Sequence, residues 1–217
     1  MRKIFILFVL VAFLGAPAKA DEGMWLPALI HKLNIGDMQA KGLKLSAEDI
    51  YSINHSSLKD AVAHIGGCTA EMISPDGLMR TNHHCAFGDI QRHSTVEHDY
   101  LRDGFWAKSR EEELPNPSKI ARFLVRAEDV TDKVLAQVTA DMSFADRQKA
   151  VITAATKIEN EAIGDTHYQA QVTSLLESNR YFLFVYETFR DVRLVGAPPQ
   201  ALGKFGGDTD NWMWPRH

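Results

Sequence analysis

Apolar residues recur at helical spacing in three parts of the chain. Residues 21–33 form one apolar helical face, made of Trp25, Leu26, Leu29, Ile30 and Leu33. Residues 143–163 carry a longer stripe, and Ser143 can cap that helix. Tyr168, Val172, Leu175 and Leu176 have similar spacing and predict a second helix after it. Ser46 and Asp49 resemble a capping box and predict a short helix.

Short apolar runs predict strands between these helices. Residues 61–65, 68–73 and 78–81 form one group, and Ser74-Pro75-Asp76-Gly77 between the last two is a strong turn signal. This group predicts a hairpin with a cysteine near each end. Further strands are predicted at 120–130, 181–186 and 192–195. Residues 86–113 mix polar and aromatic side chains and predict a loop with short helical turns.

The first twenty residues have the pattern of a secretory signal peptide. Arg2 and Lys3 precede an unbroken apolar run over residues 4–14, and the segment ends in Pro17-Ala18-Lys19-Ala20, an Ala-x-Ala-like cleavage site. As a helix the run reaches about 16 Å, against a hydrocarbon core of about 30 Å. We therefore expect export and a mature chain starting near Asp21. The alternative is a short membrane anchor.

Composition and charge narrow the class of partner. The chain is 45% hydrophobic and 24% charged, which is ordinary for a soluble globular protein. It has 24 lysine and arginine residues against 28 acidic ones, and three of the basic residues lie within 1–20, so the remainder has a net charge of about −7. Such a surface does not attract nucleic acid or anionic lipid. After residue 20, no segment is apolar enough to predict a membrane span.

Cys68 and Cys85 are the two cysteines of the sequence. Export to an oxidising compartment favours a disulfide between them. It would close a loop of about 17 residues and stabilise the fold by roughly 3 kcal/mol. Two free thiols are the alternative.

The candidate chemistry lies in Thr81-Asn82-His83-His84-Cys85. This stretch, preceded by a hairpin that begins with Cys68, resembles serine peptidases of the chymotrypsin type, in which the general base directly precedes a cysteine in a Thr-x-x-His-Cys context. A general base must lie within hydrogen-bond reach of its nucleophile, and a neighbour tied to another strand would fix its backbone.

The resemblance selects His84 as the general base. If the chain is extended here, His83 and His84 point to opposite sides. His83 would then either support a residue of the site or only pack against its neighbours. The alternatives are a purely structural histidine, or a zinc site made of Cys68, Cys85 and both histidines. The spacing does not match a zinc finger, so we expect no metal.

Three stretches are very similar to the bacterial serine dipeptidyl-peptidase family that includes dipeptidyl-peptidases 7 and 11: residues 23–27, 68–85 and 203–217. The resemblance spans essentially the whole mature chain. It implies a mainly β fold with helical segments: a chymotrypsin-like double β-barrel with a large helical domain inserted beyond this chain. Residues 21–217 would be the N-terminal part of the peptidase domain, an incomplete first barrel with a helical insert.

The resemblance also implies a reaction. Members remove dipeptides from the free N-terminus of peptides with a Ser-His-Asp triad, and the matching histidine is His84. The aspartate and serine would lie beyond residue 217, which disfavours Asp208 and Asp210 as the triad acid. Asn211 and Trp212 match positions that hold the substrate's α-amino group. On this basis the 217-residue chain alone should be inactive.

The same resemblance implies no cofactor, a full-length homodimer, and the periplasm or surface of a Gram-negative bacterium as the location. Acidic and hydrophobic preferences at the cleaved position both occur in the family. Two other functions stay open: a chymotrypsin-like endopeptidase, and an exported barrel protein without catalysis.

Overall fold

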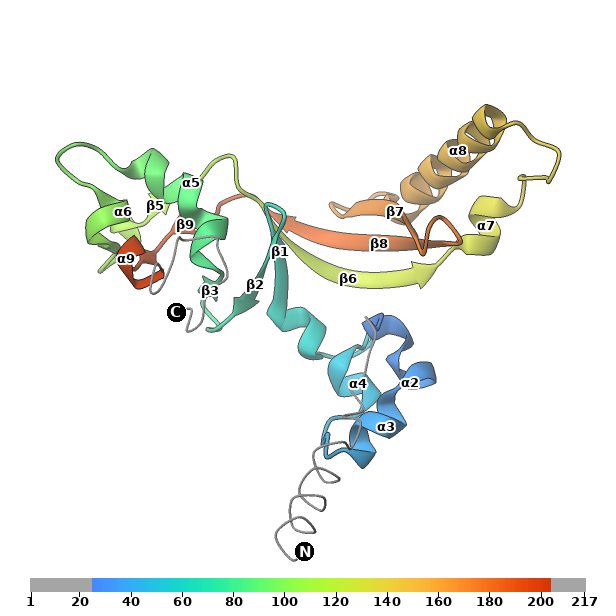
Figure 1. Ribbon diagram of the computed structural model, residues 1–217, viewed down its shortest axis with the longest axis horizontal. Helices are drawn as coiled ribbons and strands as arrows, with labels where there is room; N and C mark the ends of the chain where they lie inside the picture. The colour runs from blue at the N-terminus through green and yellow to red at the C-terminus, as the bar shows by residue number, and fades with distance from the viewer. Residues whose placement is uncertain (1–24, 204–217) are drawn as a thin grey trace, which may run out of the picture.

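The computed structural model describes residues 25–203. The predicted signal peptide at 1–20, Asp208, Asp210, Asn211 and Trp212 all lie outside this range. The described chain is a mixed fold in which helices flank an antiparallel sheet (Figure 1). Within residues 25–203, no helix combines the length and apolarity needed to cross a membrane.

A six-stranded antiparallel sheet organises the molecule. Its order is β3-β2-β1-β6-β8-β7, so β3 and β7 are its edge strands. The strands are β1 (Val62–Ile65), β2 (Cys68–Met72), β3 (Met79–Arg80), β6 (Ala121–Asp129), β7 (Gln169–Leu175) and β8 (Arg180–Phe189). The long β6–β8 pair runs from the middle of the molecule toward α7 in Figure 1.

The predicted hairpin at residues 61–81 is confirmed. Strand β1 pairs with β2 in a register that sets Ile65 opposite Cys68, and Gly66 and Gly67 form the turn with positive φ angles of 53° and 90°. Residues with a side chain rarely adopt such backbone angles, which explains why two glycines occupy this turn. Strand β2 then pairs with β3 across the predicted Ser74–Gly77 turn.

The helix predicted from Tyr168 to Leu176 is wrong. Residues 169–175 form β7, which pairs with β8 along its whole length. Its inward residues Ala170 and Val172 alternate with period two and pack on the core, so tertiary pairing outweighs the helical spacing. A turn at Leu176, Glu177 and Ser178, all with positive φ, then leads into β8.

Two helices cover one face of the sheet at β6, β7 and β8. They are α7 (Thr131–Leu135) and α8 (Phe144–Ile163), and α8 matches the helix predicted at 143–163. The Ser143 hydroxyl caps α8 by accepting from the Asp146 N–H at 3.2 Å. The core beneath these helices contains Val130, Val134, Tyr181, Leu183 and Val185.

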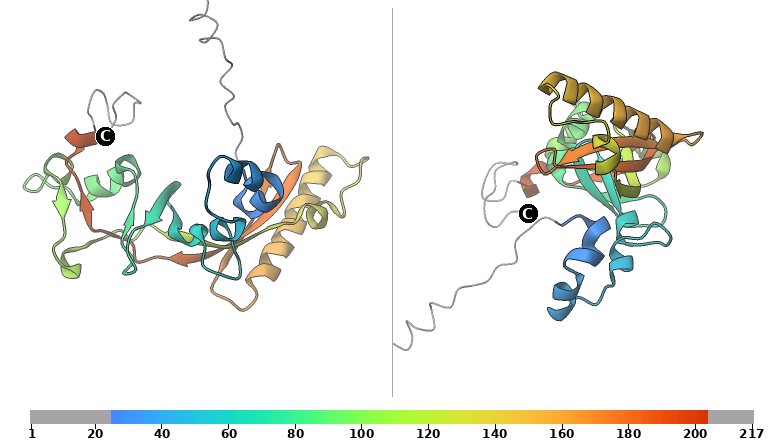
Figure 2. Two further views of the ribbon diagram at one scale, coloured as in Figure 1. Left: turned by 90° about the horizontal axis from the view of Figure 1, so that it is seen from below. Right: turned by 90° about the vertical axis from the view of Figure 1, so that its right-hand side faces the viewer.

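The opposite face of the same strands meets the N-terminal helices. Alternate residues of a strand point to opposite faces, and Phe182, Phe184 and Tyr186 of β8 point away from α8. In the described part of the helix predicted at 21–33, η1 (Pro27–Leu29) runs directly into α2 (Ile30–Leu33). The layer continues with α3 (Ile35–Ala40), α4 (Ala47–Ile50) and η2 (Leu58–Ala61). The right-hand view of Figure 2 shows α8 and these helices on opposite sides of the strands.

The predicted capping box of α4 is confirmed. The Ser46 hydroxyl accepts from the Asp49 N–H at 3.1 Å, and the Asp49 carboxylate accepts from the Ser46 N–H at 2.8 Å. Reciprocal hydrogen bonds of this kind satisfy backbone N–H groups that have no partner within the first turn of a helix.

A third cluster lies at the other end of the sheet. Its elements are α5 (His83–His93), α6 (Tyr100–Asp103), β4 (Phe105–Trp106), η3 (Arg110–Glu112), β5 (Leu114–Pro115), β9 (Arg193–Leu194), β10 (Gly196–Ala197) and α9 (Gln200–Gly203). Strand β4 pairs with β10, and β5 with β9. The loop predicted at 86–113 is wrong in its first part, because α5 occupies it and buries Ile90 in a core with Leu194 and Ala197.

The observed fold class is therefore mixed helix and antiparallel sheet rather than mainly β. The six-stranded sheet has two edges within residues 25–203. The double barrel and the helical insertion stay predictions.

Candidate active site

His84 lies in the first turn of α5, directly after the hairpin. Asn82 is the N-cap residue, with φ −69° and ψ 147°, and its carbonyl accepts from the Cys85 N–H at 3.0 Å. The two histidines therefore begin a helix, and the extended chain assumed for them is wrong. Helical residues point about 100° apart, so adjacent side chains still diverge.

The structure separates the two histidines by environment. His84 is exposed. His83 is half-buried, and its ring meets Phe87 edge-on with centroids 6.1 Å apart. The exposed imidazole can be reached by a group outside the described residues, as a general base must be by its nucleophile. The packing of His83 fits the lesser role expected for it.

Cys68 and Cys85 form the expected disulfide, with their Cα atoms 6.1 Å apart. The bridge ties the first residue of β2 to the residue after His84. A ring nitrogen of His84 lies within 4.8 Å of both sulfur atoms. Because the sulfurs are bonded to each other, neither can serve as a thiolate ligand, which removes the cysteine half of the zinc alternative.

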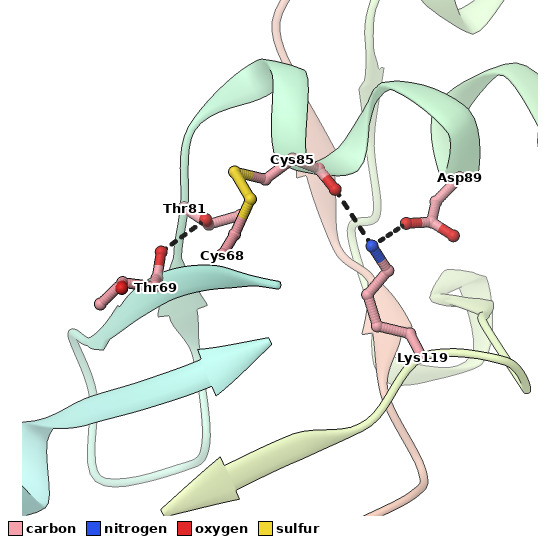
Figure 3. The surroundings of a disulfide bond; sticks show 6 residues. All are labelled: Cys68, Thr69, Thr81, Cys85, Asp89 and Lys119. Carbon is pink, nitrogen blue, oxygen red and sulfur yellow. Dashed lines mark hydrogen bonds and ion pairs between the residues drawn. A yellow bond between two sulfur atoms is a disulfide. The ribbon is translucent and has the colours of Figure 1, made fainter. Parts of the chain in front are cut away.

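A second contact holds the chain just before α5. The Thr81 hydroxyl donates to the carbonyl of Thr69 in β2 at 2.8 Å. The disulfide and this hydrogen bond therefore attach both sides of His84 to the same strand (Figure 3).

A buried charge cluster supports α5 from its other side. The Lys119 ammonium donates to the Cys85 carbonyl at 3.0 Å and pairs with the Asp89 carboxylate at 2.5 Å. Asp89 also accepts from the Arg92 guanidinium at 2.9 Å. The exposed fractions of the side chains are 6% for Asp89 and 16% for Lys119.

Sequence reasoning missed this cluster because residues 86–113 were expected to be a loop. Asp89 and Arg92 have the i, i+3 spacing of a helical ion pair, which was the available signal. Lys119 has no local signal, since its partners lie 30 and 34 positions earlier in the chain.

An apolar cavity of about 300 Å³ lies away from His84, between the N-terminal helices and the sheet. Its walls come from both layers and include Leu26, Tyr51, Val62, Leu124, Phe182, Phe184 and Tyr186. The Tyr51 hydroxyl accepts from the Ala127 N–H at 2.7 Å. Burial raises the pKa of Tyr51 above its usual value of 10.

Within residues 25–203 the site therefore consists of one exposed histidine on a firmly attached helix. It can accept and return a proton, which is one part of nucleophilic catalysis. The predicted amine-binding residues Asn211 and Trp212 lie outside the described residues.

Comparison with known proteins places this chain among peptidases. A sequence model of the family described as Peptidase S46 matches residues 20–217. The chain is 52% identical to dipeptidyl-peptidase 7 of Capnocytophaga gingivalis over 100% of its length and 31% of that relative. It is 50% identical to an Asp/Glu-specific dipeptidyl-peptidase of Flavobacterium psychrophilum, over 99% of this chain and 30% of the relative.

A solved structure agrees with the sequence matches. The crystal structure of Porphyromonas endodontalis DPP11 in complex with the dipeptide Arg-Asp superimposes with a TM-score of 0.81 at 42% identity. The match covers 91% of this chain and 29% of that one. The chain thus spans about a third of the length of the relatives it matches.

Proposed function

Because this chain belongs to the peptidase S46 family, we propose that the full-length protein is a serine dipeptidyl-peptidase that releases dipeptides from the free N-terminus of peptides. The observation that carries the proposal is His84, exposed at the start of α5 and followed by a disulfide-bonded cysteine. The identity of 52% to a dipeptidyl-peptidase 7 supports the same reaction.

In the proposed mechanism His84 is the general base. A serine outside this chain attacks the second peptide bond of the substrate, and the His84 imidazole takes the serine proton. His84 then returns this proton to the leaving amine, and the resulting acyl-enzyme is hydrolysed by the same route. An aspartate, also outside this chain, would hold the imidazole in the required tautomer. Each step is acyl or proton transfer, for which side chains suffice.

Cleavage after two residues requires a fixed position for the substrate's N-terminus. An ammonium group donates three hydrogen bonds and therefore needs oxygen acceptors. Asn211 offers an amide oxygen, and Trp212 next to it can form a wall. We assign both to this role from their match to the family motif in residues 203–217.

The proposal extends to the architecture and location of the whole protein. Residues 21–217 would form part of a double β-barrel, with a helical domain inserted later. The protein would be exported after removal of residues 1–20 to the periplasm or surface of a Gram-negative bacterium, and would act there as a homodimer. Residue preference stays open, because identity to the dipeptidyl-peptidase 7 and Asp/Glu-specific relatives is nearly equal, at 52% and 50%.

The test is His84→Ala in the full-length protein. We expect release of dipeptides from free peptides to fall roughly 10⁴- to 10⁶-fold, because the serine loses its proton acceptor. Rates are measured with fluorogenic dipeptide amides carrying acidic or hydrophobic second residues. His55→Ala, a change of an exposed histidine in the connection before η2, is the control and should keep normal activity. Near-normal rates in His84→Ala would overturn the proposal.

N-terminally blocked peptides distinguish the alternative functions. A dipeptidyl-peptidase cleaves only free N-termini, because the blocked group cannot fill an ammonium site. Cleavage of blocked peptides at similar rates would indicate a chymotrypsin-like endopeptidase. Absence of cleavage in both series would indicate an exported protein without catalysis.

A further inference from the structure

Lys119 connects the sheet to the helix that carries His84. It lies in the segment just before β6, and its side chain runs toward α5 (Figure 3). The ammonium nitrogen lies between two acceptors of that helix, the Cys85 carbonyl at 3.0 Å and the Asp89 carboxylate at 2.5 Å. One side chain thus fixes two consecutive turns of α5.

The contact at Cys85 acts on the residue next to His84. The sulfur of Cys85 is bonded to β2, and its carbonyl accepts from Lys119, so its side chain and its main chain are held from different directions. Together these contacts restrict both translation and rotation of the first turn of α5. The direction of the His84 side chain follows from the orientation of that turn.

The surroundings of the ammonium group are closed. A Cβ built on Gly66 would lie 3.5 Å from the Lys119 nitrogen, so the β1–β2 turn passes directly beside it. Asp89 is nearly fully buried, and its second oxygen pairs with Arg92, whose side chain is 52% exposed. A charge pair removed from water in this way has a defined geometry that solvent does not loosen.

We propose that Lys119, paired with Asp89, is a positioning residue for His84: it sets the orientation of the first turn of α5 through the Cys85 carbonyl. The inference rests on the proposed function, because it assumes that His84 is the general base. A shift of about 1 Å in a catalytic group can cost roughly 10²-fold in rate, so the role is measurable.

The chain offers a matched control in Lys59. Its side chain is 10% exposed, and its ammonium pairs with Asp60 and donates to the Leu124 carbonyl at 3.3 Å. Lys59 therefore has the same kinds of partner and is itself similarly buried, although Asp60 is 44% exposed where Asp89 is 6% exposed. It lies in η2, before β1, whereas α5 follows the opposite end of the hairpin. Removing the Lys59 ammonium should disturb the packing around η2 without changing the orientation of α5.

The experiment compares Lys119→Met and Lys59→Met in the full-length protein. We expect Lys119→Met to lower kcat about 10- to 100-fold, with KM for a dipeptide amide changed less than about twofold. Lys59→Met should leave kcat near normal, and it should lower the melting temperature less than Lys119→Met, because Asp60 stays in contact with solvent and Asp89 does not. Equal losses of kcat in both variants, or normal kcat in Lys119→Met, would overturn the inference.

A second variant covers the case in which Lys119→Met does not fold. Lys119→Met with Asp89→Leu removes both buried charges, a replacement that often preserves stability. Arg92 then faces solvent. The double variant should melt near the wild-type temperature and still show the reduced kcat, because the Cys85 carbonyl lacks its donor. Normal kcat in this folded protein would contradict the positioning role.

His84→Ala, assayed in parallel, separates this inference from the proposed function. If His84→Ala is inactive and Lys119→Met is normal, the positioning role alone is wrong. If His84→Ala remains active, the proposed function itself is wrong.

Discussion

The hydroxyl group of Thr131 connects three elements of the fold, β6, α7 and β8. The O–H group donates to the Asp129 carboxylate at 2.6 Å, and its oxygen accepts from the Tyr181 N–H at 3.0 Å. Thr131 is buried, at 8% exposure, so water cannot replace these bonds. The end of β6, the start of α7 and the start of β8 are therefore held together by one side chain.

We expect Thr131→Val to destabilise this junction by about 1–3 kcal/mol, because the buried Tyr181 N–H loses its acceptor. Hydrogen-exchange mass spectrometry of the peptide that covers residues 180–186, in the full-length protein, measures the loss of protection. Thr156→Val, an exposed change on α8, is the control. Unchanged protection in Thr131→Val would contradict the assignment.

The same junction predicts a dependence on pH. Burial raises the pKa of Asp129, but the hydrogen bonds from Thr131 and the charge of Arg180 outweigh it, so the pKa lies below its usual value of 3.8. A lowered folded-state pKa stabilises the fold above the unfolded pKa, and this contribution is lost as pH falls through the folded value. The cost of Thr131→Val should therefore be largest above about pH 4 and shrink toward lower pH in thermal unfolding.

At the scale of residues, the sequence predicts contacts that are close along the chain and misses those that are distant. The Cys68–Cys85 bridge could be predicted because the chain offers one pair. His84 could be selected as the candidate general base from its neighbours Thr81 and Cys85. The contacts of Lys119 could not be predicted, since they form only when β6 has paired with β1.

At the scale of elements, the predictions succeed where local pattern and tertiary packing agree. Helix α8 has a cap and an apolar stripe that packs on β7 and β8, and its bounds match the prediction. The apolar spacing of the residues in β7 fits either a helix or a strand, and the pairing with β8 makes the segment a strand. Helix α5 was missed because its buried polar residue Asp89 weakens the apolar pattern.

We expect Ser143→Ala to destabilise the first turn of α8 by about 1 kcal/mol, because the Asp146 N–H loses its acceptor. Exchange of the peptide that covers residues 144–150 reports the change. Ser174→Ala, an exposed serine in β7, is the matched control. Equal protection in both variants would mean that the cap contributes nothing.

At the scale of the whole molecule, two helical layers enclose β6 and β8 from opposite faces (Figure 2). The layer of α7 and α8 packs on a continuous core. The N-terminal layer leaves the cavity of about 300 Å³ against the sheet. Tyr51 links this layer to β6 by its bond to Ala127, close to the register shift between Leu124 and Arg126.

We expect Tyr51→Phe to loosen the N-terminal layer, since the Ala127 N–H loses the phenol oxygen that accepts its hydrogen bond. The effect should be about 1 kcal/mol, measured as faster exchange across residues 30–50. Tyr186→Phe changes a tyrosine that lines the same cavity from β8 and serves as the control. A Tyr51→Phe protein with unchanged exchange would show that apolar packing alone holds the layer.

The mixed class of the molecule could be predicted only in part, because the order of strands in a sheet is not a local property. The adjacent strands β1, β2 and β3 were predictable as a hairpin. The central pairing of β1 with β6 joins residues about sixty positions apart, such as Ala63 and Phe123, and has no signal in either segment.

The three attachments around His84 also differ in the length of chain that each must close. The Thr81–Thr69 bond spans 12 positions, the disulfide 17, and the Lys119–Cys85 bond 34. Closing the longest loop costs about 1 kcal/mol more chain entropy than closing the shortest. We therefore expect the contacts within the hairpin to form first, and the bond from Lys119 to follow once β6 has joined the sheet.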